Sequence, residues 1–196
     1  MSKAVMLSVR PKWVENIANS EKTIEVRKTR PKMNTPFKCY IYCTVETAGY
    51  DALWVLDAPT REKYSFVAVS AYLENPEGAN KGNGKVIGEF TCDEITRVNI
   101  CGFWDDSGKQ LDNRLKETCL TSKEFLDYLG EKVGYGWHIT DLRIYDAPRE
   151  LSEFERPYEC NECDAKWATE CNACREEGKI KRAPQSWCYV EAMDNG

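Results

Sequence analysis

The segment SEKTIEVRK, close to the N-terminus, places two acids and three bases around two apolar residues. Alternate residues of an extended strand point to opposite faces, so Glu25 and Arg27 would share one face. Ile24 and Val26 would point the other way, into the core, and Lys22 lies where it can fold over the charged face. The pattern indicates a polar cleft for a phosphate, a sugar or the edge of a base. The alternative is a salt-bridged strand exposed to solvent, where such pairs contribute little.

Four cysteines form two pairs late in the chain, in the segment CNECDAKWATECNAC. Two residues separate Cys160 from Cys163 and Cys171 from Cys174, and seven residues separate the pairs. Each C-x2-C turn brings two thiolates to the spacing that a tetrahedral ion needs, and thiolates favour zinc. We therefore expect a structural, non-catalytic Zn2+ site that orders a loop over residues 156–183. An iron–sulfur cluster or two labile disulfides are the alternatives.

Charge is segregated along the chain. The 196 residues carry 27 Lys and Arg against 32 Asp and Glu, a formal net charge of -5. Residues 1–38 hold nine bases and three acids, a surplus of +6, which leaves -11 for the remainder. The net charge argues against a general polyanion binder, whereas the local surplus is typical of a surface that faces phosphate. Simple solvation of these bases is the alternative.

The sequence favours a cytoplasmic protein that does not contact a membrane. The start MSKAVMLSVRPKW has no apolar stretch followed by a small-residue cleavage site. No segment approaches the roughly 20 apolar residues that a membrane-spanning helix needs. Ten cysteines in a cytoplasmic chain indicate metal ligands or buried thiols more than disulfides.

Hydrophobic patterning predicts a strand, a turn at Arg10 and a short helix, followed by the charged strand. Four further strands are expected over residues 37–45, 85–100, 136–148 and 186–193, and a helix is expected over residues 121–134. The second helix would be capped by Thr121 or Ser122 and would bury Phe125, Leu126 and Leu129. Residues 101–115 are expected to form a loop with exposed aromatic side chains.

These elements predict an α+β fold. About six strands and two short helices without βαβ alternation favour a small mixed or antiparallel barrel flanked by the helices. We treat residues 1–196 as a single domain, with the four-cysteine loop inside it. Residues 46–85 are expected to be an insertion or long excursion that holds a helix or a hairpin.

SEKTIEVR resembles the G-x-K-x-x-E-x-R signature of ASCH domains, which are relatives of the PUA-like barrels. Lys22, Glu25 and Arg27 occupy the motif positions, and Ser20 replaces the glycine, a mild change if the turn does not require a positive φ. The preceding SVRPKWVENIAN resembles the first strand and helix of the family, with the Arg10 turn between them. The likeness is to bacterial and phage members, and the four-cysteine loop is an addition to the minimal domain.

The resemblance implies a PUA-like barrel with a cleft beside the first helix, which relatives use to bind RNA or modified nucleobases. We therefore expect an RNA-binding protein whose ligand is a single-stranded or flipped base. The candidate contacts are Arg10, Lys12, Lys22, Glu25, Arg27, Lys28, Trp137 and His138. Trp104, Trp137 and Trp187 are the candidate stacking platforms, with packing in the core as the alternative for Trp137 and Trp187. Trp13 and Trp54 are expected to fill the core.

Two further functions stay open. Some members of the family are amidohydrolases of N4-acylated cytidine and others are ribonucleases; in an enzyme, Lys22 and Glu25 would be catalytic. The amidohydrolase pattern has a threonine where this chain has Glu25 and takes a glutamate from a later segment, for which Glu89 and Glu117 are candidates. His138 is the only histidine for a Ser–His or Cys–His mechanism. The third possibility is a protein–protein adaptor that uses the four-cysteine loop.

Overall fold

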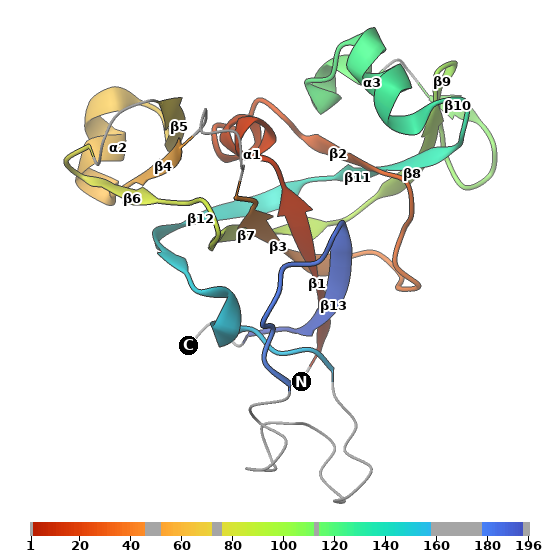
Figure 1. The fold of residues 1–196 in the computed structure, drawn as a ribbon. Coiled ribbons are helices and arrows are strands. Elements are labelled where there is room, and N and C mark those ends of the chain that lie inside the picture. Colours follow the sequence, from red (N-terminus) through yellow and green to blue (C-terminus); the bar gives the residue numbers. More distant parts are fainter. Residues whose placement is uncertain (1, 46–51, 72–75, 112–113, 158–177, 194–196) are drawn as a thin grey trace, which may run out of the picture.

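The computed structural model describes residues 2–45, 52–71, 76–111, 114–157 and 178–193, which form three sheets and three α-helices (Figure 1). The first sheet consists, in spatial order, of β12 (Thr140–Arg149), β7 (Val86–Cys92), β3 (Phe37–Cys43), β1 (Lys3–Val9) and β13 (Trp187–Glu191). The second consists of β10 (Gln110–Leu111), β9 (Gly102–Trp104), β8 (Ile95–Asn99), β11 (Gly134–His138) and β2 (Ile24–Arg27). The third consists of β5 (Ala68–Ala71), β4 (Ala52–Leu56) and β6 (Ala79–Lys81).

The helices are α1 (Pro11–Ala18), α2 (Ala58–Tyr64) and α3 (Ser122–Leu129), with 3-10 turns at Leu115–Thr118 and Leu151–Glu153. β1 and β3 run parallel, whereas the other pairs of the first sheet are antiparallel. Among the described strands, none of the three sheets closes on itself. The α+β class is therefore confirmed, but its sheets remain open and do not form the closed barrel that we expected.

Helix α1 begins after Arg10, with Pro11 at the first turn, where the missing N–H of proline costs nothing. Val14 and Ile17 lie on its buried face. The helix ends in a turn where Ser20 has a φ of 61°. This left-handed conformation costs a non-glycine residue roughly 1–2 kcal/mol. The replacement of glycine by serine therefore falls at a position that does require a positive φ.

Both faces of β3 are buried, because the strand lies near the middle of the first sheet. Cys39 and Ile41 belong to the main core beneath α1, while Tyr40 and Tyr42 enter a second apolar cluster that contains Phe154. Burial raises the pKa of the Cys39 thiol well above its usual value. The central strand is thus more deeply enclosed than its alternating pattern indicates.

Two of the expected strands each divide between two sheets. The predicted strand over residues 85–100 breaks after Cys92, and the predicted strand over residues 136–148 breaks at Ile139. β7 and β12 join the first sheet, while β8 and β11 join the second. The two breaks meet where the His138 N–H donates to the Glu94 carbonyl. Strand-like patterning along a segment carries no signal for a change of sheet, which is why the expectation of two single strands was wrong.

Other elements differ from expectation in detail. Residues 101–115 contain β9 and β10, and Phe103 is buried beneath α3 instead of exposed. Thr121 caps α3 as predicted, and Phe125 is buried, but Leu126 is exposed. Cys101 lies near an apolar, strand-like run, which favours a buried thiol, but it is exposed. None of the described helices is long and apolar enough to cross a membrane.

The described part of residues 46–85, which was expected to hold a helix or a hairpin, contains both a helix and strands. α2 follows Asp57, whose carboxylate accepts from the Thr60 N–H, and packs beside the third sheet. The Asn19 side chain at the end of α1 bonds the backbone of Val67 and Ala68, which fixes this sheet to the helix. The third sheet therefore supports α1 from the side away from α3 (Figure 1).

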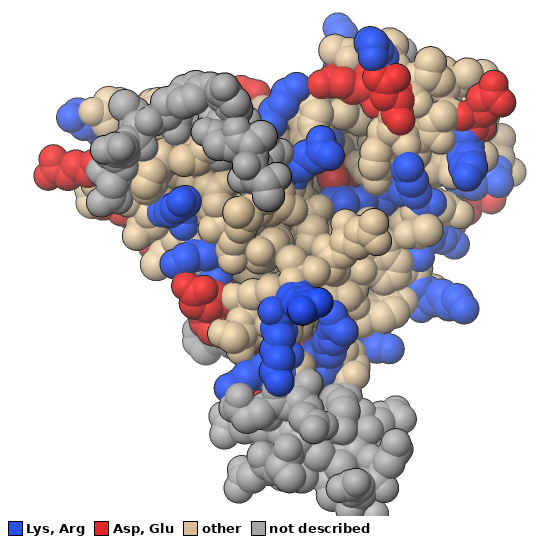
Figure 2. All heavy atoms as spheres, in the orientation of Figure 1, with Lys and Arg blue, Asp and Glu red and all other residues tan. Residues whose placement is uncertain are grey.

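Basic side chains cluster on one face of the molecule. Figure 2 shows Lys and Arg gathered below α3, over β2 and β11, with acidic side chains on α3 above them. Lys28, Arg30 and Lys32 follow β2 and are exposed. The surplus of charge in residues 1–38 is thus partly concentrated at one surface.

Candidate functional site

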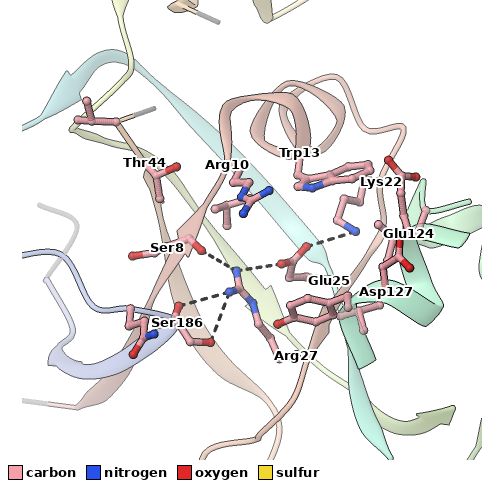
Figure 3. Close-up of a pocket in the computed structure, with 16 residues that line it drawn as sticks. Ser8, Arg10, Trp13, Lys22, Glu25, Arg27, Thr44, Glu124, Asp127 and Ser186 are labelled. Atoms are coloured by element: carbon pink, nitrogen blue, oxygen red, sulfur yellow. Dashed lines mark hydrogen bonds and ion pairs between the residues drawn. The ribbon is translucent and has the colours of Figure 1, made fainter. Parts of the chain in front are cut away.

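A pocket of about 820 Å³ lies beside the start of α1 (Figure 3). Its walls come from the ends of β1 and β3, from β2, from α3 and from the residues just before β13. Segments far apart in the chain therefore meet at one opening. The three motif residues Lys22, Glu25 and Arg27 all line it.

Glu25 lies between the two cations at the floor of the pocket (Figure 3). One carboxylate oxygen lies 3.2 Å from Lys22 Nζ, and the other lies 2.9 Å from Arg27 Nη2. Lys22, Glu25 and Arg27 are only 2%, 7% and 6% exposed. A buried charge is tolerated when it is paired and hydrogen-bonded, and within this cluster each cation is paired with the shared carboxylate.

Lys22 is held by three acceptors. Its Nζ donates to the Ile24 carbonyl at 2.9 Å and to the Thr118 carbonyl at 2.6 Å, in addition to its contact with Glu25. These acceptors match the three N–H donors of an ammonium group. The arrangement positions Glu25 and does not favour a reacting amine, which an amidohydrolase based on Lys22 would need.

Arg27 joins three walls of the pocket. Its Nη2 donates to the Ser8 carbonyl at 2.9 Å as well as to Glu25, and Nη1 lies 3.4 Å from the Ser186 carbonyl. Its Nε is buried and has no hydrogen-bond partner in the described part of the chain. Arg27 therefore ties β2 to β1 and to the segment before β13.

The rim beside α1 carries a cation and an aromatic ring. Arg10 is exposed, and none of the ion pairs among the described residues involves it. Trp13 is half-buried; it packs against the main core, as expected, and also lines the pocket. Lys12 Nζ lies 4.4 Å from the centre of the Trp13 ring, and Lys22 Nζ lies 5.5 Å from it. An indole of this kind can stack against a planar ligand.

Helix α3 supplies an acidic wall that the sequence analysis did not assign to the site. Glu124 and Asp127 line the pocket, and Glu124 pairs with Lys12 at 3.0 Å. The Thr121 backbone N–H and the Lys12 ammonium lower the pKa of Glu124 to about 2, so its charge is present at neutral pH. Tyr128 lines the same wall, with Lys28 Nζ 5.0 Å from its ring centre. The capping signal predicted this helix but contained no information about what it faces.

Four predicted contacts do not line the pocket: Lys12 and Lys28 lie beside residues that do, whereas Trp137 and His138 lie elsewhere. Trp137 is fully buried and packs edge-on against Phe37, with ring centres 5.7 Å apart. It therefore has no face to offer a base, and its predicted role in stacking is wrong. His138, at the end of β11, bonds Asp93 through Nδ1 at 2.7 Å and is not among the residues lining the pocket.

The later glutamates that an amidohydrolase would need are also placed outside the pocket. Glu89 accepts from the Tyr145 hydroxyl at 2.9 Å, and Glu117 pairs with Arg114. Neither residue lines the pocket. The acids that do lie there, besides Glu25, come from α3.

The four-cysteine cluster lies outside the described residues. Cys160, Cys163, Cys171 and Cys174 fall within residues 158–177, and the structure neither supports nor contradicts their predicted role. In the described ranges, no group of three or more His, Cys, Asp or Glu side chains is placed to hold a metal ion.

Comparison with solved structures relates this architecture to the ASCH protein of Zymomonas mobilis. A serine-to-alanine variant of that protein is similar with a TM-score of 0.51 and 14% identity, over 96% of this chain and 88% of the other. A tyrosine-to-phenylalanine variant has a TM-score of 0.48 and 16% identity, over 97% and 91% of the two chains. A further structure of that ASCH protein gives 0.47 and 15%, over 96% and 87%. No protein-family profile and no curated sequence matches the chain.

The fold and the pocket together define an α+β protein with a charged pocket beside its first helix. The likeness to the serine-to-alanine variant assigns it an ASCH-like fold, as the signature in residues 20–27 predicted.

Proposed function

We propose that the pocket binds one nucleotide of a nucleic acid, either in a single strand or with its base flipped out of a duplex. RNA is the expected class of nucleic acid. The observation that carries the proposal is the meeting of Lys22, Glu25 and Arg27 with Arg10 and Trp13 at one opening. A volume of about 820 Å³ lies within the range of small-molecule sites, roughly 300–1,000 Å³. The ASCH-like fold supports the proposal, because relatives with this signature are associated with RNA and modified bases.

Each group has a distinct part in this proposal. The Glu25 carboxylate can accept a hydrogen bond from a base N–H, since each of its oxygens has a second lone pair. Arg10 at the rim suits a phosphate or a sugar hydroxyl, and the Trp13 ring offers a stacking surface. Lys22 and Arg27 hold the acceptor in place. The acidic wall of α3 would repel phosphate, so the phosphate is expected on the side of Arg10.

Changing the rim residues tests the proposal. Trp13→Ala and Arg10→Glu are each expected to weaken binding of a short single-stranded RNA about tenfold, through lost stacking and lost phosphate attraction. Fluorescence anisotropy at fixed salt measures the affinity. Lys63→Glu, on α2 and away from the pocket, has the same change of charge as Arg10→Glu and is the control. Equal affinities for wild type and both rim variants would contradict the proposal.

We also propose that Cys160, Cys163, Cys171 and Cys174 hold a structural zinc ion, on the chemistry of a four-thiolate donor set alone. Protein purified under reducing conditions is expected to contain about one zinc per chain, and Cys171→Ser is expected to lose it. Cys101→Ser, an exposed cysteine outside the cluster, is the control and should keep the metal. Metal-free or iron-containing protein would contradict the assignment.

A further inference from the structure

A continuous row of polar and aromatic residues crosses the second sheet. In the strand register, Arg27 of β2 lies opposite Tyr135 of β11, and Tyr135 lies opposite Arg97 of β8. Arg97 lies opposite Trp104 of β9, and Trp104 lies opposite Gln110 of β10. Residues directly opposite one another in neighbouring strands share a face of the sheet. The five side chains therefore form one row on one face, which we call the cross-strand row.

The cross-strand row lies at the edge of the core, where this face of the second sheet becomes exposed to solvent. The next pairs along the same strands, Glu25–Trp137–Ile95, are buried against the first sheet. In the row, by contrast, Arg97 and Gln110 are exposed, and Tyr135 and Trp104 are half-buried. Arg27 is the buried end of the row and also part of the pocket floor. The row is thus a surface that continues directly from the pocket.

Two arginines besides Arg27, namely Arg97 and Arg30, lie along this surface. Arg97 has no ion pair among the described residues, and the Arg30 guanidinium lies 5.8 Å from the centre of the Tyr135 ring. The two nearby acids, Asp105 and Asp106, both have partners among the described residues. Asp105 accepts from the Ser107 hydroxyl and from the backbone N–H groups of Ser107 and Lys109, and Asp106 pairs with Arg30 at 3.4 Å.

Alternating rings and cations suit a single strand of nucleic acid. Bases of any sequence can stack on Trp and Tyr, and Arg groups neutralise the phosphates between them. Five strands spaced about 4.8 Å apart give a row about 19 Å long, which is enough for a few nucleotides. A duplex keeps its bases stacked inside and has none to offer such rings.

We propose that the cross-strand row binds the nucleotides adjacent to the one in the pocket, so that the ligand is a single-stranded polynucleotide and not a free nucleotide. This inference rests on the proposed function of the pocket. The strand would pass from the pocket at Arg27 across Tyr135 and Arg97 to Trp104.

Two ligands separate the row from the pocket. The first is a mixed-sequence single-stranded RNA of about 10 nucleotides, within the usual site size of such surfaces; the second is an equal mixture of the four nucleoside 5′-monophosphates. Trp104→Ala and Arg97→Glu are each expected to weaken binding of the RNA about tenfold and to leave monophosphate binding unchanged. Trp104→Phe, which keeps a ring, should restore most of the affinity.

An exposed pair on α2 is the matched control. Lys63 lies 4.9 Å from the ring centre of Tyr64, so Tyr64→Ala and Lys63→Glu remove the same types of group far from the row. These variants should bind the RNA as wild type does. Arg97 is exposed, so its substitution tests the surface even if Trp104→Ala reduces folding.

The outcomes distinguish the two proposals. RNA binding that survives Trp104→Ala and Arg97→Glu, yet is lost in Trp13→Ala, overturns the row and leaves the pocket proposal standing. Loss of RNA binding in the row variants, with no monophosphate binding and no effect of Trp13→Ala, supports the row and contradicts the pocket. Equal affinity for the same RNA annealed to its complement overturns the single-strand assignment.

Discussion

Glu25→Ala is expected to lower the free energy of unfolding by about 3–5 kcal/mol, because it leaves two buried cations without their carboxylate. Lys22 and Arg27 both contact Glu25 and are almost fully enclosed. An unpaired charge that water can reach carries no such penalty, but these two side chains would stay buried. Urea denaturation followed by circular dichroism measures the change.

An exposed acid provides the comparison for Glu25. Asp146 also pairs with an arginine, Arg61, but its side chain is 72% exposed. Asp146→Ala is therefore expected to cost less than about 1 kcal/mol. Similar losses in the two variants would show that the pocket cluster is solvated in solution. The prediction also means that binding by Glu25 variants has to be measured on protein shown to be folded.

Trp137→Ala is expected to cost about 3–5 kcal/mol of stability, in the range for removing a buried aromatic side chain. Trp137 has no exposed surface and packs against Phe37 and Trp187. Its loss should leave a cavity in the main core. Because it does not line the pocket, the folded fraction of the variant should keep the RNA affinity of the wild type. Denaturation and anisotropy together measure both quantities.

Trp13→Ala should show the opposite behaviour and is the matched control. Trp13 is half-buried at the pocket rim, so its removal is expected to reduce affinity more than stability. A Trp137→Ala protein that is as stable as the wild type but no longer binds RNA would contradict the structure. Such a result would restore the stacking role that the sequence suggested for Trp137.

The parts of the fold predicted correctly are those with local signals. The proline after Arg10 marks the start of α1, and Thr121 with Glu124 forms the capping box that starts α3. The division of residues 85–100 and 136–148 between two sheets depends on how distant strands pair. Alternating polarity reports which face of a strand is buried, but not which sheet the strand joins.

The candidate site shows the same limit. Lys22, Glu25 and Arg27 lie within one turn and strand, so their spacing was sufficient to predict that they share a face. The acidic wall formed by Glu124 and Asp127 comes from a helix about 100 residues further along the chain. Trp137 lies in the core and Trp13 lies at the pocket rim, a difference that the sequence does not reveal because a tryptophan has the same pattern signal in both places.

The pairing of β13 with β1 bears on how the protein matures on the ribosome. Leu7 lies opposite Trp187, and the Ser8 N–H donates to the Ser186 carbonyl. The first strand of the chain therefore pairs with one of the last described segments. During synthesis this edge of β1 therefore stays unpaired until β13 has been made, and unpaired strand edges are prone to wrong pairing. Arg27 gains its Ser186 contact only at that point, so the pocket of the nascent chain is incomplete until then.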